Sequence, residues 1–223
     1  MCGDLEVSKI YCGDTVLWQR GGGRVLPAGY TATDGHYINQ SPFNTNFRPT
    51  SGILKLETDI TINSAGPQAI IGGFGSAPYD LRDVGSLETW ISGSYGAYVF
   101  HASTFGSPHC SYIHNNCVSS TYSGNEFEIS ATLSSTLNAI SVNGDLTELP
   151  ISEAQTIEVL ERDVWIGSNG DPALAPDDEY LYGTIHNLKL YDYDTLARDF
   201  VPAVRDSDSQ SGLYDFVAQQ FYY

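Results

Sequence analysis

GTIHNLKLYDYDTLARDFVPAVRDSDSQSGLYDFVAQQFYY, residues 183–223, carries more structural information than the rest of this chain. It opens with a strand-like segment from Gly183 to Tyr191. Two further pieces follow, Thr195-Leu-Ala-Arg-Asp-Phe-Val-Pro202 and Gly212-Leu-Tyr-Asp-Phe216. The order of the three pieces is the most distinctive pattern in the sequence, and it indicates the closing strands of a β domain.

These pieces resemble the end of laminin-G-like, concanavalin A-like domains of tailed phages and prophages. There, a Gly-x-Ile-x-x-Leu-x-Leu-Tyr strand precedes Leu-x-Arg-Asp-Phe-x-Pro and Gly-Leu-Tyr-Asp. The segment Leu26-Pro-Ala-Gly-Tyr30, followed by Tyr37-Ile38-Asn39, resembles the opening of the same group, although Asn39 stands where an Asp is common. The resemblance implies an all-β fold, a two-sheet antiparallel jelly-roll sandwich over residues 25–223.

Composition and periodicity agree with this fold class. The 223 residues include 22 Gly and 15 Tyr, which suits many short strands joined by tight turns. Apolar residues alternate with polar ones at two places, which predicts strands with one face in the core. The apolar rows are Leu54, Leu56, Thr58, Ile60 and Ile62, and Phe127, Ile129, Ala131 and Leu133.

Shorter signals complete the prediction of the fold. Asn143-Gly144 predicts a two-residue hairpin, because both positions tolerate positive φ. Trp165, between Val164 and Ile166, is expected in the core. The absence of a repeat of 20 to 50 residues argues against solenoids and propellers.

The first 24 residues are predicted to form a separate element. Two β-prone runs around a turn over residues 1–20 predict a short hairpin, and Gly21-Gly-Gly-Arg24 predicts a flexible joint before the sandwich. A lone hairpin is marginal in water, so its apolar side chains need a partner. We expect an assembly or docking interface, and the alternative is an extra strand pair of the main domain. The interface residues would be Val7, Ile10, Tyr11, Val16 and Trp18.

Charge limits the classes of partner. The formal net charge is −17, from 27 acidic and 10 basic residues, so we expect no nucleic acid partner. No run of apolar residues is long enough for a membrane helix, and the N-terminus lacks the pattern of a secretory signal, so we expect no membrane insertion. These features fit a protein made in a host cytoplasm and carried in a virion.

A cysteine and histidine cluster leaves three interpretations open. His109, Cys110, His114 and Cys117 lie within nine residues, but their order matches no standard zinc pattern. Cys110 and Cys117 could instead form a disulfide, or remain free thiols in a variable loop.

No catalytic residues are predicted, and the chain is expected not to be an enzyme. Glucanases on the same sandwich use a Glu-x-Asp-x-x-Glu strand, because one carboxylate acts as nucleophile and another as acid/base. Here Glu57 and Asp59 supply the first two acids, and Ile62 replaces the second Glu. We therefore interpret Glu57 and Asp59 as part of a solvated strand face.

Two binding sites are hypothesised. A glycan site would combine aromatic platforms with polar groups, and its residues are Trp90, Tyr95, Tyr98, Tyr79 and Asp80. A calcium site at a sandwich rim is implied by the resemblance. It would use the acidic loop with Asp177, Asp178 and Glu179, and no other cofactor is expected.

The sequence and the resemblance together predict a phage virion structural protein. The sandwich would be a capsid or tail decoration, a fibre part or an adhesin, with a host surface glycan as ligand. Its partners would be other virion proteins and copies of itself, most simply in a trimer. The alternative function is a carbohydrate-binding lectin of bacterial or prophage origin that is not part of a virion.

Overall fold

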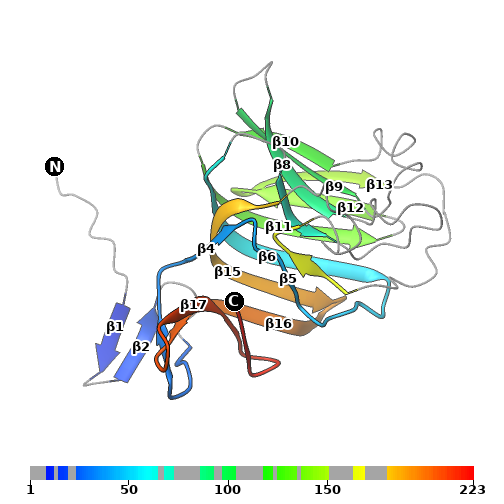
Figure 1. The fold of residues 1–223 in the computed structure, drawn as a ribbon. Coiled ribbons are helices and arrows are strands. Elements are labelled where there is room, and N and C mark those ends of the chain that lie inside the picture. The colour runs from blue at the N-terminus through cyan, green and yellow to red at the C-terminus, as the bar shows by residue number, and fades with distance from the viewer. Residues whose placement is uncertain are drawn as a thin grey trace.

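The chain folds as a sandwich of two antiparallel β-sheets (Figure 1). The computed structural model describes residues 24–64, 68–72, 86–92, 97–103, 118–122, 125–134, 137–150, 163–168 and 180–223, and two strands nearer the N-terminus. All of the regular structure in these residues is β. Among them, no helix has the length and apolar character needed to cross a membrane. The predicted fold class is confirmed.

The strands fall into a larger and a smaller sheet. The larger sheet runs in the order β13 (Asp145–Pro150), β12 (Leu137–Val142), β11 (Glu126–Ser134), β6 (Ile53–Ile62), β15 (Tyr182–Asp192), β16 (Thr195–Arg205), β17 (Gln210–Asp215) and β18 (Gln220–Tyr222). Two short strands also join it, since β3 (Tyr30–Ala32) pairs with β16 and β4 (His36–Asn39) pairs with β15. The smaller sheet runs β10 (Val118–Tyr122), β9 (Ala97–Ser103), β8 (Ser86–Ser92), β7 (Gln68–Gly72), β14 (Trp165–Ile166) and β5 (Phe43–Asn44).

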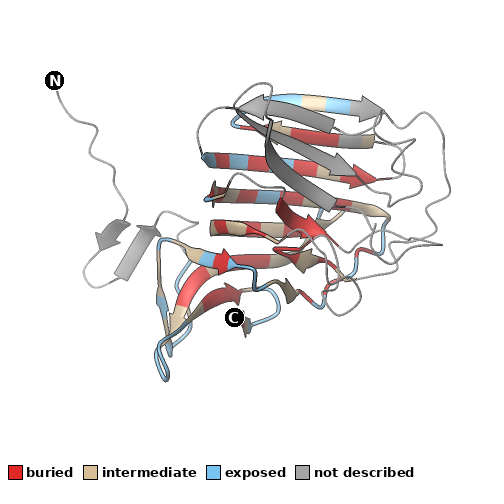
Figure 2. Cartoon of the chain, turned by 45° about the horizontal axis from the view of Figure 1, so that its top comes forward, coloured by how far each residue is buried: buried red, intermediate tan, exposed pale blue. Residues whose placement is uncertain are grey.

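Three central strands of the larger sheet, β6, β11 and β15, alternate between buried and more exposed residues (Figure 2). In β6, Leu54, Leu56, Thr58, Ile60 and Ile62 are all buried. The row Phe127, Ile129, Ala131 and Leu133 of β11 is buried in the same way. Both predicted apolar rows are thus confirmed. We call the face that carries the intervening polar residues the outer face.

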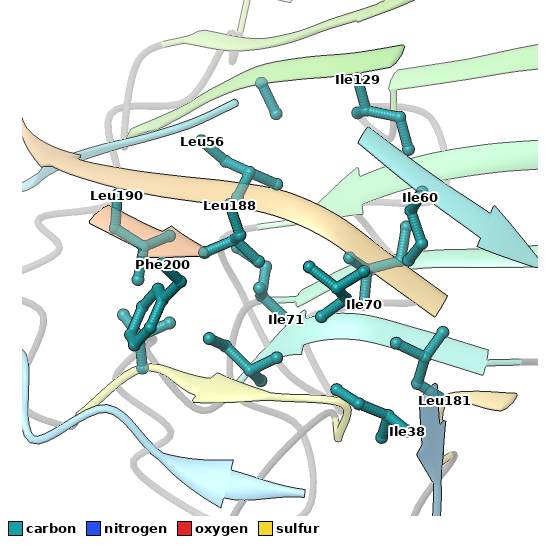
Figure 3. Packing of buried hydrophobic residues seen from close by; sticks show 14 of the residues in the cluster. Ile38, Leu56, Ile60, Ile70, Ile71, Ile129, Leu181, Leu188, Leu190 and Phe200 are labelled. Carbon is teal, nitrogen blue, oxygen red and sulfur yellow. The ribbon is translucent and has the colours of Figure 1, made fainter. Parts of the chain in front are cut away.

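The core lies between the sheets. Ile70 and Ile71 of β7 pack with Leu188 of β15 and other buried residues in one cluster (Figure 3). Every described residue of β7 is buried, as expected for a strand covered on both sides. Gln68 is the polar member of this strand, and its amide donates to the Ser64 carbonyl at 2.7 Å while accepting from the Tyr182 N–H at 2.7 Å. Its burial is therefore compensated by hydrogen bonds that also join the two sheets.

Two details of local structure test the sequence predictions. Asn143 and Gly144 both have positive φ, 52° and 87°, and they connect β12 to β13 as a two-residue turn, which confirms the predicted hairpin. The core assignment of Trp165 was wrong, because this residue is only half-buried while its neighbours Val164 and Ile166 are fully buried. In β14 successive side chains point to opposite faces, so the burial of Ile166 turns Trp165 away from the core.

The pieces Arg198-Asp-Phe200 and Tyr214-Asp215 form one ion-pair network. Asp215 of β17 has no exposed surface, and its carboxylate accepts from the N–H groups of Asp199 and Val217 at 3.0 and 2.9 Å. Its other oxygen lies 3.3 Å from Nε of Arg198. Arg198 also donates to the carbonyls of Thr45 and Asn46, at 3.0 and 2.7 Å. The network therefore fixes β16 to β17 and to the segment after β5.

Pro202 sits where β16 changes neighbours. β15 pairs with β16 up to Phe200, and β3 pairs with it from Ala203 onward. The Pro202 carbonyl accepts from the Thr33 N–H at 3.1 Å. The backbone polar positions of this residue therefore point to the edge of β16 that pairs with β15 and then with β3, and not to β17. A proline has no N–H, and here none is required.

The C-terminal end of the outer face is covered by rings and arginines. Tyr30 contacts Tyr214 and Phe221, with ring centroids 4.9 and 5.4 Å apart, and Tyr214 contacts Phe216 at 5.4 Å. Arg24 lies over the Phe216 ring and forms an ion pair with Asp199. Arg205 lies 5.3 Å from the Phe221 centroid and pairs with Asp208. The side chains of this C-terminal end thus largely satisfy one another.

Near the N-terminus, β1 (Lys9–Cys12) and β2 (Thr15–Gln19) pair with each other as a separate two-stranded sheet. Ile10 pairs with Trp18 and Tyr11 with Val16, so these four residues lie in the expected hairpin. The joint at residues 21–23 and Val7 lie outside the described residues. The division at residues 20 and 24 and the interface role remain predictions.

Candidate functional site

A groove of about 330 Å³ crosses the outer face of the larger sheet. Its floor comes from β6, β11, β12 and β15, and the turn between β15 and β16 forms one side. The lining residues with side-chain chemistry are Lys55, Glu57, Ser130, Thr132, Tyr191, Tyr193 and Asp194, and the apolar contributors include Ala139 and Leu146. We call this site the outer groove.

Strand register brings these side chains together from distant parts of the chain. Lys55 of β6 is opposite Thr132 of β11 on one side and Tyr191 of β15 on the other. Glu57, two residues on, is opposite Ser130. Directly opposed residues point to the same face of an antiparallel sheet, so the five side chains form one cross-strand patch.

A phenol–carboxylate pair occupies the middle of the groove. Tyr191 Oη donates to Glu57 Oε2 at 2.8 Å, and Lys189 Nζ lies 3.8 Å from the same oxygen. Burial raises the pKa of Tyr191 to about 12, and the hydrogen bond and charge of Glu57 act in the same direction. The phenol therefore keeps its proton at physiological pH, and Glu57 is held in place as an acceptor.

The rim is built by the turn after β15. Lys55 Nζ lies 2.5 Å from Asp194 Oδ1 and 5.0 Å from the centre of the Tyr193 ring, a cation–π distance. Tyr193 is 53% exposed, and Leu146 on β13 is 62% exposed. An exposed aromatic ring and an exposed aliphatic side chain thus border a groove with a polar floor.

The backbone of this turn is held in an uncommon conformation. Tyr193 is the first residue of a two-residue loop between Asp192 and Thr195, and its φ is 57°. Gly or Asn usually fills such a position, because a side chain there is strained. Asp192 stabilises the turn by accepting from the N–H groups of Thr50 and Ser51, both at 2.9 Å, and from the Thr50 hydroxyl at 2.7 Å. Burial favours the protonated form, but these hydrogen bonds outweigh it and lower the pKa of Asp192 to about 2.

An exposed ring beside carboxylates, hydroxyls and an ammonium group is suited to a ligand with one apolar face and many hydroxyls. The arrangement offers less for hydrolysis. Ile62, which replaces the second Glu of the glucanase pattern, is buried, and the Asp59 carboxylate accepts a hydrogen bond from the Asn187 amide. Glu57 is 54% exposed on the outer face, in agreement with its interpretation as part of a solvated strand face.

The structure only partly places the glycan residues that we predicted from the sequence. Trp90 lies in β8 and Tyr98 in β9, where Trp90 pairs with Val99 and Ile91 with Tyr98. Tyr79, Asp80 and Tyr95 lie outside the described residues. This second glycan site remains a prediction.

The predicted metal ligands also lie outside the described residues. This applies to Asp177, Asp178 and Glu179, and to the cluster of His109, Cys110, His114 and Cys117. Within the described ranges, no group of three or more His, Cys, Asp or Glu side chains is close enough to hold a metal ion.

Sequence reasoning missed the outer groove, because its residues come from several strands that are spread over positions 55–194 of the chain. One local signal was available. Asp192-Tyr-Asp194 separates two long strand-like pieces, and a tyrosine in such a short connection occupies a position where glycine or asparagine is expected.

Comparisons with known proteins identify the fold. No family model and no curated protein matches the sequence. A heptameric SAP-like pentraxin from Limulus polyphemus is 12% identical with a TM-score of 0.50, over 71% of this chain and 74% of the pentraxin. Full-length tailspike protein 2 from Escherichia coli O157:H7 bacteriophage CAB120 is 11% identical with a TM-score of 0.52, over 80% of this chain but 27% of the tailspike.

Mouse laminin alpha1 domains LG4-5 also match, at 14% identity and a TM-score of 0.49, over 74% of this chain and 44% of that one. The chain thus spans only about a quarter of the tailspike and less than half of the laminin fragment. At these identities the likenesses concern the fold alone.

Proposed function

We propose that the protein is a carbohydrate-binding β-sandwich and that the outer groove is its glycan site. The observation that carries this proposal is the Tyr193 ring, which stands half-exposed beside Glu57, Lys55 and Asp194. A pyranose ring can stack its apolar face on such a ring while its hydroxyls reach the neighbouring carboxylates and the hydroxyls of Ser130 and Thr132.

The strain at Tyr193 supports a functional role for this side chain. An L-residue in the left-handed region costs roughly 1–2 kcal/mol, which a glycine would avoid. Strained residues of this kind concentrate at binding sites, where the surrounding structure over-determines them. Here the Asp192 hydrogen bonds hold the turn, and the ring is presented at the groove rather than packed in the core.

The groove proposal is tested by titrating the full chain with a panel of neutral oligosaccharides. Tyr193→Ala should weaken binding about tenfold, as expected for the loss of one aromatic stacking partner. Tyr37→Ala is the matched control, because Tyr37 on β4 is 51% exposed, almost as much as Tyr193, and does not line the groove. Equal affinities for the two variants, or no binding by the unchanged protein, would contradict the proposal.

For the setting, we infer a phage virion, in which the sandwich is displayed as a decoration, fibre part or adhesin facing a host glycan. The resemblance of both ends of the sequence to phage domains supports this. The alternative is a lectin that is not part of a virion. Such a lectin would bind glycan through the outer groove without any contact to virion proteins. Mass spectrometry of purified particles separates the two, because only the first setting requires the chain to be present in them.

We also infer a homo-oligomer, most simply a trimer, joined through the N-terminal hairpin. The separate pairing of β1 with β2 supports an element with its own role. Light scattering of the full chain, compared with a chain that starts at Arg24, tests this inference. A full chain that is already monomeric would contradict it.

A further inference from the structure

We propose that the outer groove selects amino sugars with a free, protonated amine and rejects acidic sugars, an inference that rests on the proposed glycan site. The geometry behind it is the distribution of charge over the outer face around the groove. The side chains that β6, β11, β13, β15 and the following turn place on the outer face include six carboxylates and two ammonium groups: Glu57, Asp59, Glu126, Glu128, Glu148 and Asp194 against Lys55 and Lys189.

Both ammonium groups on this part of the face already have carboxylate partners. Lys55 pairs with Asp194 at 2.5 Å, and Lys189 lies 3.8 Å from Glu57. A ligand carboxylate or sulfate would have to share an ammonium group with one of these partners or displace it, and it would do so in a field dominated by six carboxylates. An anionic sugar is therefore disfavoured both by lost ion pairs and by repulsion.

A cationic sugar is attracted by the same carboxylates. Glu57 is 54% exposed and Asp194 is 66% exposed, so both carboxylates can be approached from the groove. The Tyr191 hydroxyl, which keeps its proton at physiological pH, holds Glu57 in position at 2.8 Å. When the ring of a hexosamine stacks on Tyr193, its hydroxyls lie in the groove. The protonated amine of the same sugar can then form an ion pair with these carboxylates, which line the same groove.

The test uses three trisaccharides titrated into the full chain at low salt, in buffer that keeps the amine protonated and carboxylates ionised. The probes are the glucosamine trimer, the N-acetylglucosamine trimer and trigalacturonic acid. The glucosamine trimer should bind about two- to fivefold more tightly than its acetylated form, as expected for one exposed ion pair. The acid should show no measurable binding, and high salt should remove the preference between the first two.

Two charge-matched variants locate the effect. Glu57→Gln should abolish the preference for the free amine, so that the amine and acetylated trimers bind with equal affinity, whatever affinity both lose with the Glu57 carboxylate. Glu126→Gln removes the same charge from the same face, but Glu126 lies at the start of β11 and does not line the groove, so the preference should persist.

The outcomes separate the two proposals. Equal binding of the amine and acetylated trimers, or binding of trigalacturonic acid, overturns the selectivity while leaving the glycan site intact. An equal loss of preference in both variants also overturns it, because the effect would then be a general field rather than Glu57. Failure of all three probes and of the neutral panel overturns the glycan site itself.

Discussion

The two ends of the outer face use similar residues in opposite ways. At the C-terminal end, Tyr30, Tyr214, Phe216 and Phe221 contact one another, and Arg24 and Arg205 lie over rings and pair with aspartates. At the groove end, Tyr191 and Tyr193 make no ring–ring contact with any other residue that the structure describes. Aromatic and charged content alone therefore does not mark a binding site. The difference lies in the ring–ring contacts, because a cation lies near a ring at both ends and Lys55 is 5.0 Å from the Tyr193 centroid.

The comparison assigns stability to the C-terminal strands, and Asp215→Ala, a change on the core side of β17, tests this most severely. The change leaves Arg198 and two backbone N–H groups without their buried partner. We expect a loss of about 3–5 kcal/mol in the free energy of unfolding, measured by chemical denaturation. Asp208→Ala is the control, because it breaks a solvent-exposed pair with Arg205 and should cost far less. Similar losses in both variants would contradict a stabilising network centred on Asp215.

Arg24→Ala tests the same end with a pH dependence. It leaves the buried Asp199 carboxylate without its ion-pair partner, and Arg24 itself is 44% exposed, so we expect a smaller loss of about 1–2 kcal/mol near neutral pH. Burial raises the pKa of Asp199 above its usual value of 3.8, against the opposing charges of Arg24 and Lys189. The loss should therefore shrink as the pH falls through the raised pKa, because a protonated Asp199 needs no partner.

Stability measured at several pH values checks the Arg24 prediction. Glycan binding by the groove is expected to stay unchanged in this variant, since Arg24 does not line it. A loss that grows on acidification would show that the sign is wrong.

Asp192→Asn tests how much the hydrogen bonds that hold the Tyr193 turn contribute to stability at the groove end. Asp192 has its pKa lowered to about 2, so its hydrogen bonds to Thr50 and Ser51 contribute stability above the usual value of 3.8, and this contribution is lost as the pH falls towards 2. We expect the variant to lose about 1 kcal/mol near neutral pH, because the neutral asparagine amide keeps only one acceptor oxygen for these hydrogen bonds. The difference from the unchanged protein should shrink as the pH falls towards 2 and should vanish only below that pH. Thermal unfolding across this range would reveal whether it does.

Tyr193→Gly should have the smallest effect on stability and the clearest effect on function. Removing the left-handed strain gains roughly 1 kcal/mol, and the greater flexibility of glycine in the unfolded chain offsets about 0.5–1 kcal/mol of it. Glycan binding should nevertheless weaken about tenfold, because the stacking ring is gone. Calorimetric titration and thermal unfolding of the same sample measure both quantities. A clearly destabilised variant would show that Tyr193 serves the fold rather than a ligand.

The sequence predicted the fold better than the site, for a physical reason. The buried rows of β6 and β11 have a period of two, and Asn143-Gly144 is a turn signal within a few residues, so both are visible locally. The size and apolar character of Trp165 predict a core position, but the alternation along β14 turns it to the face opposite that of Ile166. The groove depends on the register that sets Lys55 beside Tyr191, and register is a long-range property.

Pro202 bears on how reliably the sheet assembles. A slip of β16 by one residue would turn the nitrogen of this proline towards β17, where a ladder hydrogen bond would be missing. The same slip would move Phe200 out of the core and turn Asp199 into it, although Phe200 is now fully buried and Asp199 is paired on the outer face. Pro202 and the alternation of Asp199 with Phe200 thus penalise the same slip independently, so that the register of β16 is specified twice.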